Sequence, residues 1–328
     1  MLDLSTARGI KNELMARFSE QEDGRAVPGI RSEGMAGGSF AVGLTVAADG
    51  TEGFGVSLRI PGTRVRHAAL VRDFQEEMGV EVDVRVIGDI RAIRQDQSVP
   101  VHEPVSRQRP LQPGSSVGHQ LVSAGTLGCF VLVDGLERPA ILSNNHVLAA
   151  SDRGIAGDPI VQPGAYDGGD HPADHVAELS AFVPLSESGT TYDVAVAEVL
   201  DERLVSSNDF PDGPIAGLTD SPEGGLVEKW GRTTGHTAGR ITAVELDGLD
   251  IDYAGRLIRF NGVIEIESLN SAPFSAGGDS GSVIYSSSSR EGYGLLFAGS
   301  TRGGPNGTPL TYANPLGGAL SAVNARLI

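Results

Sequence analysis

Three segments of this 328-residue chain carry side chains that together suit nucleophilic acyl transfer. Ser280 lies in the run Ser-Ala-Gly-Gly-Asp-Ser-Gly-Ser of residues 275–282. His146 lies in Leu-Ser-Asn-Asn-His-Val-Leu of residues 142–148, and Asp193 begins the alternating run Asp-Val-Ala-Val-Ala. An imidazole titrates near neutral pH, so it can take the hydroxyl proton and return it to a leaving group, while a carboxylate fixes its tautomer. We therefore predict that His146, Asp193 and Ser280 form a catalytic triad.

Glycines next to Ser280 predict an oxyanion hole. The tetrahedral intermediate of acyl transfer carries a negative charge that preorganised N–H groups stabilise. The backbone N–H groups of Gly278 and Ser280 are the natural donors, because glycine permits a turn that most residues would disfavour.

Each triad residue has an ordinary explanation when it is taken alone. A histidine in an apolar run is more often a core residue, an aspartate before a strand belongs to a turn, and a serine among glycines lies in a loop. Their order along the chain, with these neighbours, favours catalysis over three coincidences.

Two patterns of elements must position these residues. The first part of the chain alternates helical and strand periodicity and predicts a small α+β domain over residues 1–95. Its expected helices are 5–20 and 64–78, and its expected strands are 39–46, 54–60 and 80–86. Residues 96–118 contain four prolines and few core residues, which predicts a linker. Short strands and glycine turns over residues 119–328 predict a pair of antiparallel barrels with the site between them.

Composition narrows the possible partners and the compartment. The formal net charge of −17 argues against nucleic acid or an anionic membrane, because both require a basic face. The single cysteine, Cys129, permits no internal disulfide and leans toward a reducing compartment. The first residues lack the pattern of a signal peptide, and no apolar run of about 18 residues predicts a membrane span. We therefore expect a cytoplasmic protein.

From about residue 120 the chain resembles trypsin-like, chymotrypsin-fold serine peptidases, on the strength of the three triad segments. The segment Gly-Arg-Thr-Thr-Gly-His-Thr-Ala-Gly-Arg of residues 231–240 is similar to bacterial proteases of the α-lytic protease and streptogrisin type. This resemblance implies a mainly β fold, with a chymotrypsin-like double six-stranded antiparallel β-barrel after the α+β domain. It also implies an ion pair between Arg232 and Asp279.

The chain is also similar to plant Narrow Leaf-type proteases, through residues 80–88 and 157–169 besides the triad segments. That resemblance implies a homo-oligomer. The chain departs from the trypsin-like pattern in having Ser282 where a glycine is usual, and Ala298 where a serine usually supports the triad aspartate. One hydrogen bond to Asp193 is therefore expected to be missing.

The resemblance also locates a specificity pocket. It places Phe274 at the pocket floor and Ser275, Ala298, Gly299 and Ser300 in its walls, with no acidic residue to bind Arg or Lys. This predicts cleavage after small or medium apolar residues. Packing of Phe274 in the core, with the pocket built elsewhere, remains an alternative.

Together these features predict a serine endopeptidase that acts on protein or peptide substrates without a cofactor or metal. The His and Asp residues of 170–175 are interpreted as a solvated turn. The alternative is a catalytically silent or latent peptide-binding or oligomeric scaffold with a protease fold. In the predicted protease, the N-terminal domain would be either pro-like or a permanent accessory module.

Overall fold

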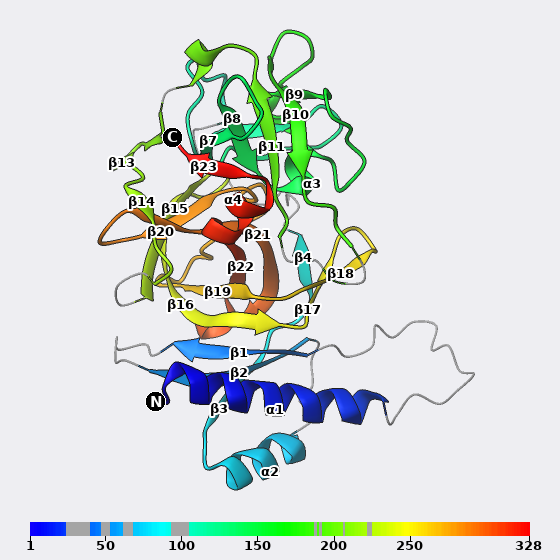
Figure 1. Ribbon diagram of the computed structural model, residues 1–328, viewed down its shortest axis with the longest axis vertical. Coiled ribbons are helices and arrows are strands. Elements are labelled where there is room, and N and C mark those ends of the chain that lie inside the picture. The colour runs from blue at the N-terminus through cyan, green and yellow to red at the C-terminus, as the bar shows by residue number, and fades with distance from the viewer. Residues whose placement is uncertain are drawn as a thin grey trace, which may run out of the picture.

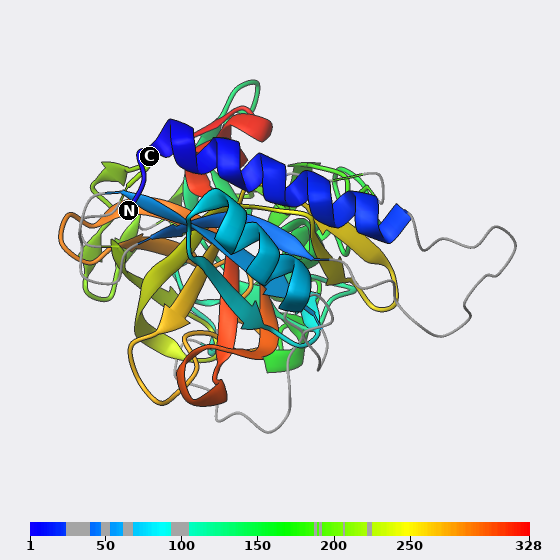
Figure 2. The same ribbon diagram turned by 90° about the horizontal axis from the view of Figure 1, so that it is seen from below.

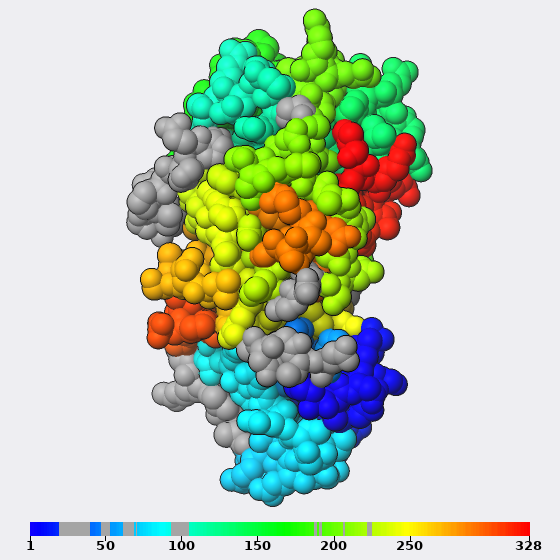
Figure 3. All heavy atoms as spheres, turned by 90° about the vertical axis from the view of Figure 1, so that its left-hand side faces the viewer, coloured from blue at the N-terminus to red at the C-terminus, as the bar shows by residue number. Residues whose placement is uncertain are grey.

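The computed structural model describes residues 1–23, 40–46, 53–61, 68–92, 105–186, 189, 192–205, 207–221 and 225–328. The molecule is elongated, with the N-terminal unit at one end, a barrel in the middle and a second curved sheet at the other end (Figure 1). The space-filling view shows the same order along the surface, from cyan and blue through yellow and orange to green (Figure 3).

The N-terminal unit is a three-stranded sheet covered by two helices. Its elements are α1 (Leu4–Asp23), β1 (Ala41–Val46), β2 (Phe54–Ile60), α2 (Ala68–Met78) and β3 (Val82–Val86). Strands β1 and β2 are antiparallel, and β2 and β3 are parallel. Viewed from this end, the two helices lie over the strands (Figure 2), and Phe18 of α1 and Phe74 of α2 share one buried cluster. The predicted α+β arrangement is confirmed.

Strand pairing and buried charge fix this unit to the rest of the molecule. β1 pairs antiparallel with β16 (Gly235–Asp247), so the N-terminal strands extend the sheet of the middle barrel. The fully buried guanidinium of Arg59 donates to both carboxylate oxygens of the buried Glu265, at 2.7 Å each. Lys11 pairs with Asp247 at 2.6 Å. The unit is thus docked through both backbone and side-chain contacts.

The middle barrel is closed. Its six strands are β15 (Leu226–Gly231), β16, β19 (Val263–Ser268), β20 (Val283–Ser286), β21 (Glu291–Gly303) and β22 (Pro309–Pro315). Antiparallel pairs run in a ring from β15 through β16, β19, β22, β21 and β20 back to β15. Its buried cluster includes Phe274, Ile284 and Leu296.

Six strands of the second sheet form a half-barrel, in the order β7-β8-β11-β10-β9-β5. Their bounds are β5 (Ser116–His119), β7 (Cys129–Val133), β8 (Ala140–Ser143), β9 (Pro159–Val161), β10 (His175–Phe182) and β11 (Ala195–Val199). The short β6 (Gly125–Thr126) pairs with β5, and β23 (Ala325–Leu327) pairs with β7. Helix α4 (Leu316–Ala322) packs in a cluster with side chains of both barrels. The predicted mainly β, chymotrypsin-like double-barrel fold is confirmed.

Further short elements complete the chain. They are β4 (Ile90–Ala92), the helix α3 (Asn145–Leu148), β12 (Asp209–Phe210), β13 (Gly213–Pro214), β14 (Gly217–Leu218), β17 (Leu249–Asp252) and β18 (Leu257–Phe260). β4 lies between the β17–β18 hairpin and β21 in the sheet. At three residues it is too short for periodicity to reveal.

The segment 96–118, predicted as a linker, is in part built into the half-barrel. Residues 96–104 lie outside the described residues, but β5 begins at Ser116, and Leu111 and Val117 are fully buried in the half-barrel core. Prolines and polar residues around these two apolar side chains mask their role in the sequence. None of the described helices has the length and apolar character needed to span a bilayer.

Candidate active site

The structure brings His146 and Asp193 together. The short helix α3 carries His146 directly after β8, and Asp193 precedes β11, the strand that pairs with β8. His146 Nδ1 lies 2.5 Å from Asp193 Oδ2, and the His146 backbone N–H donates to Asp193 Oδ1 at 3.2 Å. A carboxylate on Nδ1 selects the tautomer with its proton there, which leaves Nε2 as the base.

Both barrels hold the Asp193 backbone. Asn144, two residues before the histidine, donates from Nδ2 to the Asp193 carbonyl at 2.7 Å. The Asp193 N–H donates to Oδ1 of Asn314 in β22 at 2.8 Å. Asp193 is fully buried, so these bonds satisfy backbone groups that water cannot reach.

A residue that sequence reasoning missed completes the surroundings of Asp193. The Tyr253 hydroxyl, at the tip of the β17–β18 hairpin, donates to Asp193 Oδ2 at 2.6 Å. Burial and the neighbouring Asp193 charge hold the pKa of Tyr253 well above its usual range, so the phenol keeps its proton and donates. The hydrogen bond expected to be missing at Ala298 is therefore supplied from elsewhere. An isolated tyrosine in a turn gave no sequence signal of this role.

Ser280 lies in a tight turn at the interface of the barrels. The Ser280 carbonyl accepts from the N–H of Thr126 in the half-barrel at 2.8 Å, and the next N–H, of Gly281, donates to Leu296 in β21. Gly281 has φ +95°, and a Cβ there would lie 2.1 Å from Oγ of Ser143 at the end of β8. The turn thus lies against the strand that leads to His146, and it accepts only glycine after the serine.

Two threonine side chains hold the loop before Ser280. The Gly277 carbonyl accepts from Thr233 Oγ1 at 2.6 Å, and the Gly278 carbonyl accepts from Thr126 Oγ1 at 2.8 Å. Because a trans peptide points its N–H opposite to its C=O, the Gly278 N–H faces away from Thr233. Gly278 has φ +99°, and a Cβ there would lie 2.4 Å from Thr233 Oγ1.

The predicted ion pair between Arg232 and Asp279 is wrong. Arg232 forms a bidentate pair with Asp167, with Nε 2.7 Å from Oδ2. The cation near Asp279 is the fully buried Lys229, with Nζ 3.5 Å from Oδ2. Lys229 lies in β15 with its side chain toward the barrel interior, whereas Arg232 follows the strand and turns toward the half-barrel, where Asp167 is located.

Asp279 also accepts four hydrogen bonds. The donors are Thr233 N–H at 2.8 Å, Thr234 N–H at 3.1 Å, Thr234 Oγ1 at 2.7 Å and Ala276 N–H at 2.9 Å. The carboxylate therefore ties the loop that carries Ser280 to the turn after β15.

Of the residues predicted for the specificity pocket, the floor residue lies in the barrel core, and two wall residues are hydrogen-bonded to other residues. Phe274 is fully buried in the core cluster of the closed barrel, in line with the alternative left open by the sequence. Ser275 Oγ lies 2.7 Å from Oγ1 of Thr311, and Ser300 Oγ donates to the Arg302 carbonyl at 2.7 Å.

The remaining predicted wall, at the edge of β21, is covered by the N-terminal region. β4 pairs antiparallel with this edge, with Ala92 opposite Ala298 and Ile90 opposite Ser300. A cavity of about 270 Å³ beside it is lined by Ala92, His146 and Tyr253 among others.

Ser280 is only 1% exposed, and His146 Nε2 is buried with no hydrogen-bond partner among the described residues. A separate cavity of about 940 Å³, between α1 and the closed barrel, contains no triad residue in its lining.

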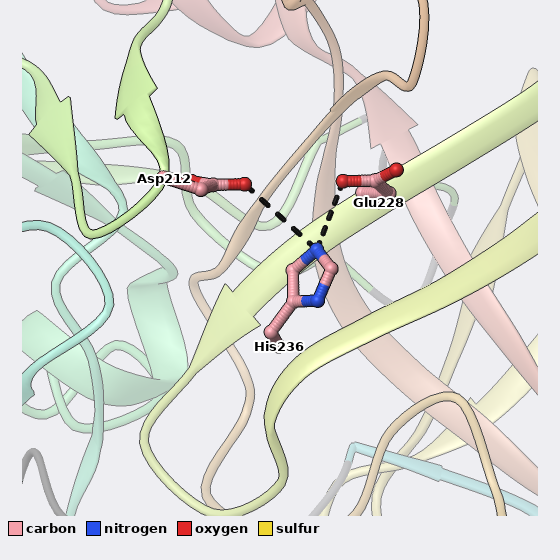
Figure 4. A group of neighbouring side chains, drawn as sticks. All are labelled: Asp212, Glu228 and His236. Carbon is pink, nitrogen blue, oxygen red and sulfur yellow. Dashed lines mark hydrogen bonds and ion pairs between the residues drawn. The ribbon is translucent and has the colours of Figure 1, made fainter.

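One side-chain group has the residue types of a metal site. His236 Nε2 lies 2.8 Å from Glu228 and 3.8 Å from Asp212 (Figure 4). Asp212 is already bound by the Arg290 guanidinium, at 2.9 and 3.1 Å, and by the Tyr285 hydroxyl at 2.9 Å. Both carboxylate oxygens of Asp212 are therefore already paired with a guanidinium, so we assign no metal here.

A closed six-stranded antiparallel barrel, a second half-barrel and a His–Asp pair at their junction define the chymotrypsin-like serine protease fold. No family model matches the chain, and no curated protein does. Among solved structures, the chain is similar to Thermobifida fusca protease A (17% identity, 66% of this chain and 97% of that one, TM-score 0.46). It is also similar to a Cellulomonas bogoriensis chymotrypsin (20%, 66% and 97%, TM-score 0.45) and to a glutamic acid-specific serine protease (18%, 66% and 100%, TM-score 0.46). These likenesses are to bacterial proteases of the kind that the sequence resembles, at 20% identity or less over 66% of this chain.

Proposed function

We propose that the protein is a serine endopeptidase that cleaves peptide bonds through an acyl-enzyme on Ser280. The observation that carries this proposal is the buried His146–Asp193 pair, which leaves Nε2 as the available base. Ser280 Oγ attacks the scissile carbonyl carbon and gives its proton to His146, which then passes it to the leaving amine. The N–H groups of Gly278 and Ser280 stabilise the oxyanion, and water completes hydrolysis by the reverse proton transfers.

The substrates would be proteins or peptides cleaved after small or medium apolar residues. The residues along the edge of β21 that would contact the substrate, Ala298, Gly299 and Ser300, are small and uncharged. A panel of chromogenic peptides tests this preference, and a strong preference for Arg or Lys would contradict it. We also propose a cytoplasmic homo-oligomer, to be tested by cell fractionation and light scattering.

Covalent labelling tests the chemistry directly. A fluorophosphonate should modify the wild-type chain and the Ser221→Ala control, in which an exposed serine is removed, but not Ser280→Ala. Asp193→Asn should slow labelling by a factor of about 10⁴, because the imidazole then adopts the wrong tautomer. Labelling that persists in Ser280→Ala would place the nucleophile elsewhere.

A second candidate is the latent form of the same protein, and the position of β4 favours it. An extended peptide binds a sheet edge by adding a strand. β4 already pairs with the edge of β21 at residues 298–300, and the catalytic serine is almost fully buried. On this proposal, β4 must leave the edge before substrate binds. The β17–β18 hairpin stays in place because Arg256 Nη2 donates to Asp152 Oδ2 at 2.9 Å.

Two aspartate substitutions in β4 test latency in the full chain. Ile90 is 4% exposed, so Ile90→Asp removes apolar burial and adds a buried charge, both of which favour release of the strand. Fluorophosphonate labelling of Ser280 should then be about tenfold faster or more, since each 1.4 kcal/mol changes a population tenfold. Arg91→Asp is the matched control, because the Arg91 side chain is 63% exposed. Equal rates for wild type and both variants would exclude β4 as the barrier.

A further inference from the structure

We infer that Tyr253 is a positioning residue for the proposed reaction, and that its hydroxyl fixes the Asp193 carboxylate beneath His146. This inference rests on the proposed function. It assigns to a hairpin of the closed barrel the role that a serine on the β21 strand has in the proteases the chain resembles.

The geometry at Asp193 leaves little freedom to the carboxylate. Oδ2 lies 2.5 Å from His146 Nδ1 and accepts from the Tyr253 hydroxyl at 2.6 Å, while Oδ1 accepts from the His146 backbone N–H at 3.2 Å. The Tyr253 and His146 rings meet edge to face, with centroids 5.8 Å apart and planes at 74°. The phenol therefore constrains both members of the pair, one by a hydrogen bond and the other by packing.

The hairpin that carries Tyr253 is itself held at several points. The Tyr253 N–H closes the turn onto the Arg256 carbonyl at 2.8 Å. Arg256 donates to Asp152 and to the Leu185 carbonyl, so the tip of a closed-barrel hairpin is attached to the half-barrel. The Tyr253 ring stacks on Phe260, with centroids 6.1 Å apart. The hydroxyl is thus delivered to Asp193 by a rigid support.

Electrostatics distinguishes this role from simple packing. Two donors share Oδ2, so part of the carboxylate charge is directed to the phenol rather than to the imidazole. Without the phenol hydroxyl, more of the charge would act on His146. The hydrogen bond from Nδ1 would shorten, and the carboxylate would stabilise a positive charge on the imidazole more strongly.

Tyr253→Phe in the full chain tests this, since it removes one oxygen and keeps the ring. The matched control is Tyr285→Phe, because the buried Tyr285 also donates to a carboxylate, Asp212 Oδ2 at 2.9 Å, outside the triad. We expect Tyr253→Phe to lower the rate of fluorophosphonate labelling about tenfold or more, the loss expected for a bond to a charged group. The acid limb of the labelling rate should move to higher pH.

A readout that needs no turnover separates this proposal from the proposed function. The proton between His146 Nδ1 and Asp193 should give a far-downfield NMR resonance that moves further downfield in Tyr253→Phe and not in Tyr285→Phe. An unchanged resonance and pH profile, with only a lower melting temperature, would overturn the positioning role. A chain that is never labelled but shows the resonance shift would contradict the protease proposal and leave the role of Tyr253 supported.

Discussion

The substitution Lys229→Met tests how the charge of Asp279, the residue before Ser280, is balanced. Lys229 and Asp279 are both fully buried, with Nζ 3.5 Å from Oδ2. At an effective dielectric constant of about 20, two unit charges at that distance attract by about 5 kcal/mol. Methionine has a similar shape and removes only the charge and the donors, so Asp279 would remain buried without its cation.

The loss of folding free energy in Lys229→Met depends on the Asp279 carboxylate that remains buried. Breaking a buried pair from one side costs about 3–5 kcal/mol. The four hydrogen bonds to Asp279 place the expected loss near the lower end of that range, about 3 kcal/mol. The matched control is Lys11→Met, since its partner Asp247 is 33% exposed and stays in contact with water when the lysine charge is removed, so this change should cost less than Lys229→Met.

Urea unfolding of wild type, both lysine variants, Asp279→Asn and the double variant Lys229→Met/Asp279→Asn measures these terms. The double variant should lose less stability than the sum of its two single changes, because the second change removes the charge that the first left unpaired. If the two changes simply added, or if Lys229→Met were as mild as Lys11→Met, the lysine would not neutralise Asp279 and the reasoning would fail.

Three further predictions concern other parts of the fold. Gly281→Ala should abolish labelling, because its Cβ would lie 2.1 Å from a serine hydroxyl at φ +95°, whereas Gly317→Ala, with no atom within 4 Å, should label normally. Arg59→Met should cost about 3–5 kcal/mol in urea unfolding by leaving Glu265 buried without its guanidinium. Burial raises the pKa of Cys129 from 9.0 to about 12, so the folded chain keeps this proton longer than the unfolded chain. The contribution of this thiol to the free energy of unfolding should be fully present below pH 9 and be lost as the pH rises to about 12. Cys129→Ala should therefore lose less stability over this pH range than the wild type.

The three segments of the predicted triad are recognisable in the sequence because their signals are local. The short runs around His146, Asp193 and Ser280 each contain the residues that shape their own turn, such as the glycine at 281 that admits Ser143. The structure shows His146 and Asp193 in contact and places Ser280 in the turn between the barrels. The three strands and both helices of the N-terminal unit were likewise visible as periodicity.

The partners of buried charges could not be predicted, because they depend on where a side chain leaves its strand. Lys229 and Arg232 are three residues apart, and the sequence predicted a pair with Asp279 only for Arg232. β15 directs the first into the barrel and releases the second toward Asp167. Tyr253 is an extreme case, since its contact with Asp193 depends on a hairpin whose tip is tied to the half-barrel.

β4 connects the two proposals about this site, and it restricts how a latent form can be opened. The same three residues cover the edge of β21 and provide the strand to which β17, at Asp252, is paired. The N-terminal unit that precedes them is docked by β1–β16 pairing and by the buried Arg59–Glu265 pair. Breaking either contact would cost several kcal/mol of free energy, roughly what a buried ion pair costs to break. Detaching the whole unit would also remove β4 from β17, and so would destabilise the hairpin that carries Tyr253. A local displacement of β4, with the unit still docked, opens the substrate edge while the hairpin keeps its bonds to the half-barrel. Activation would then need only a small change at residues 90–92 rather than loss of the N-terminal unit.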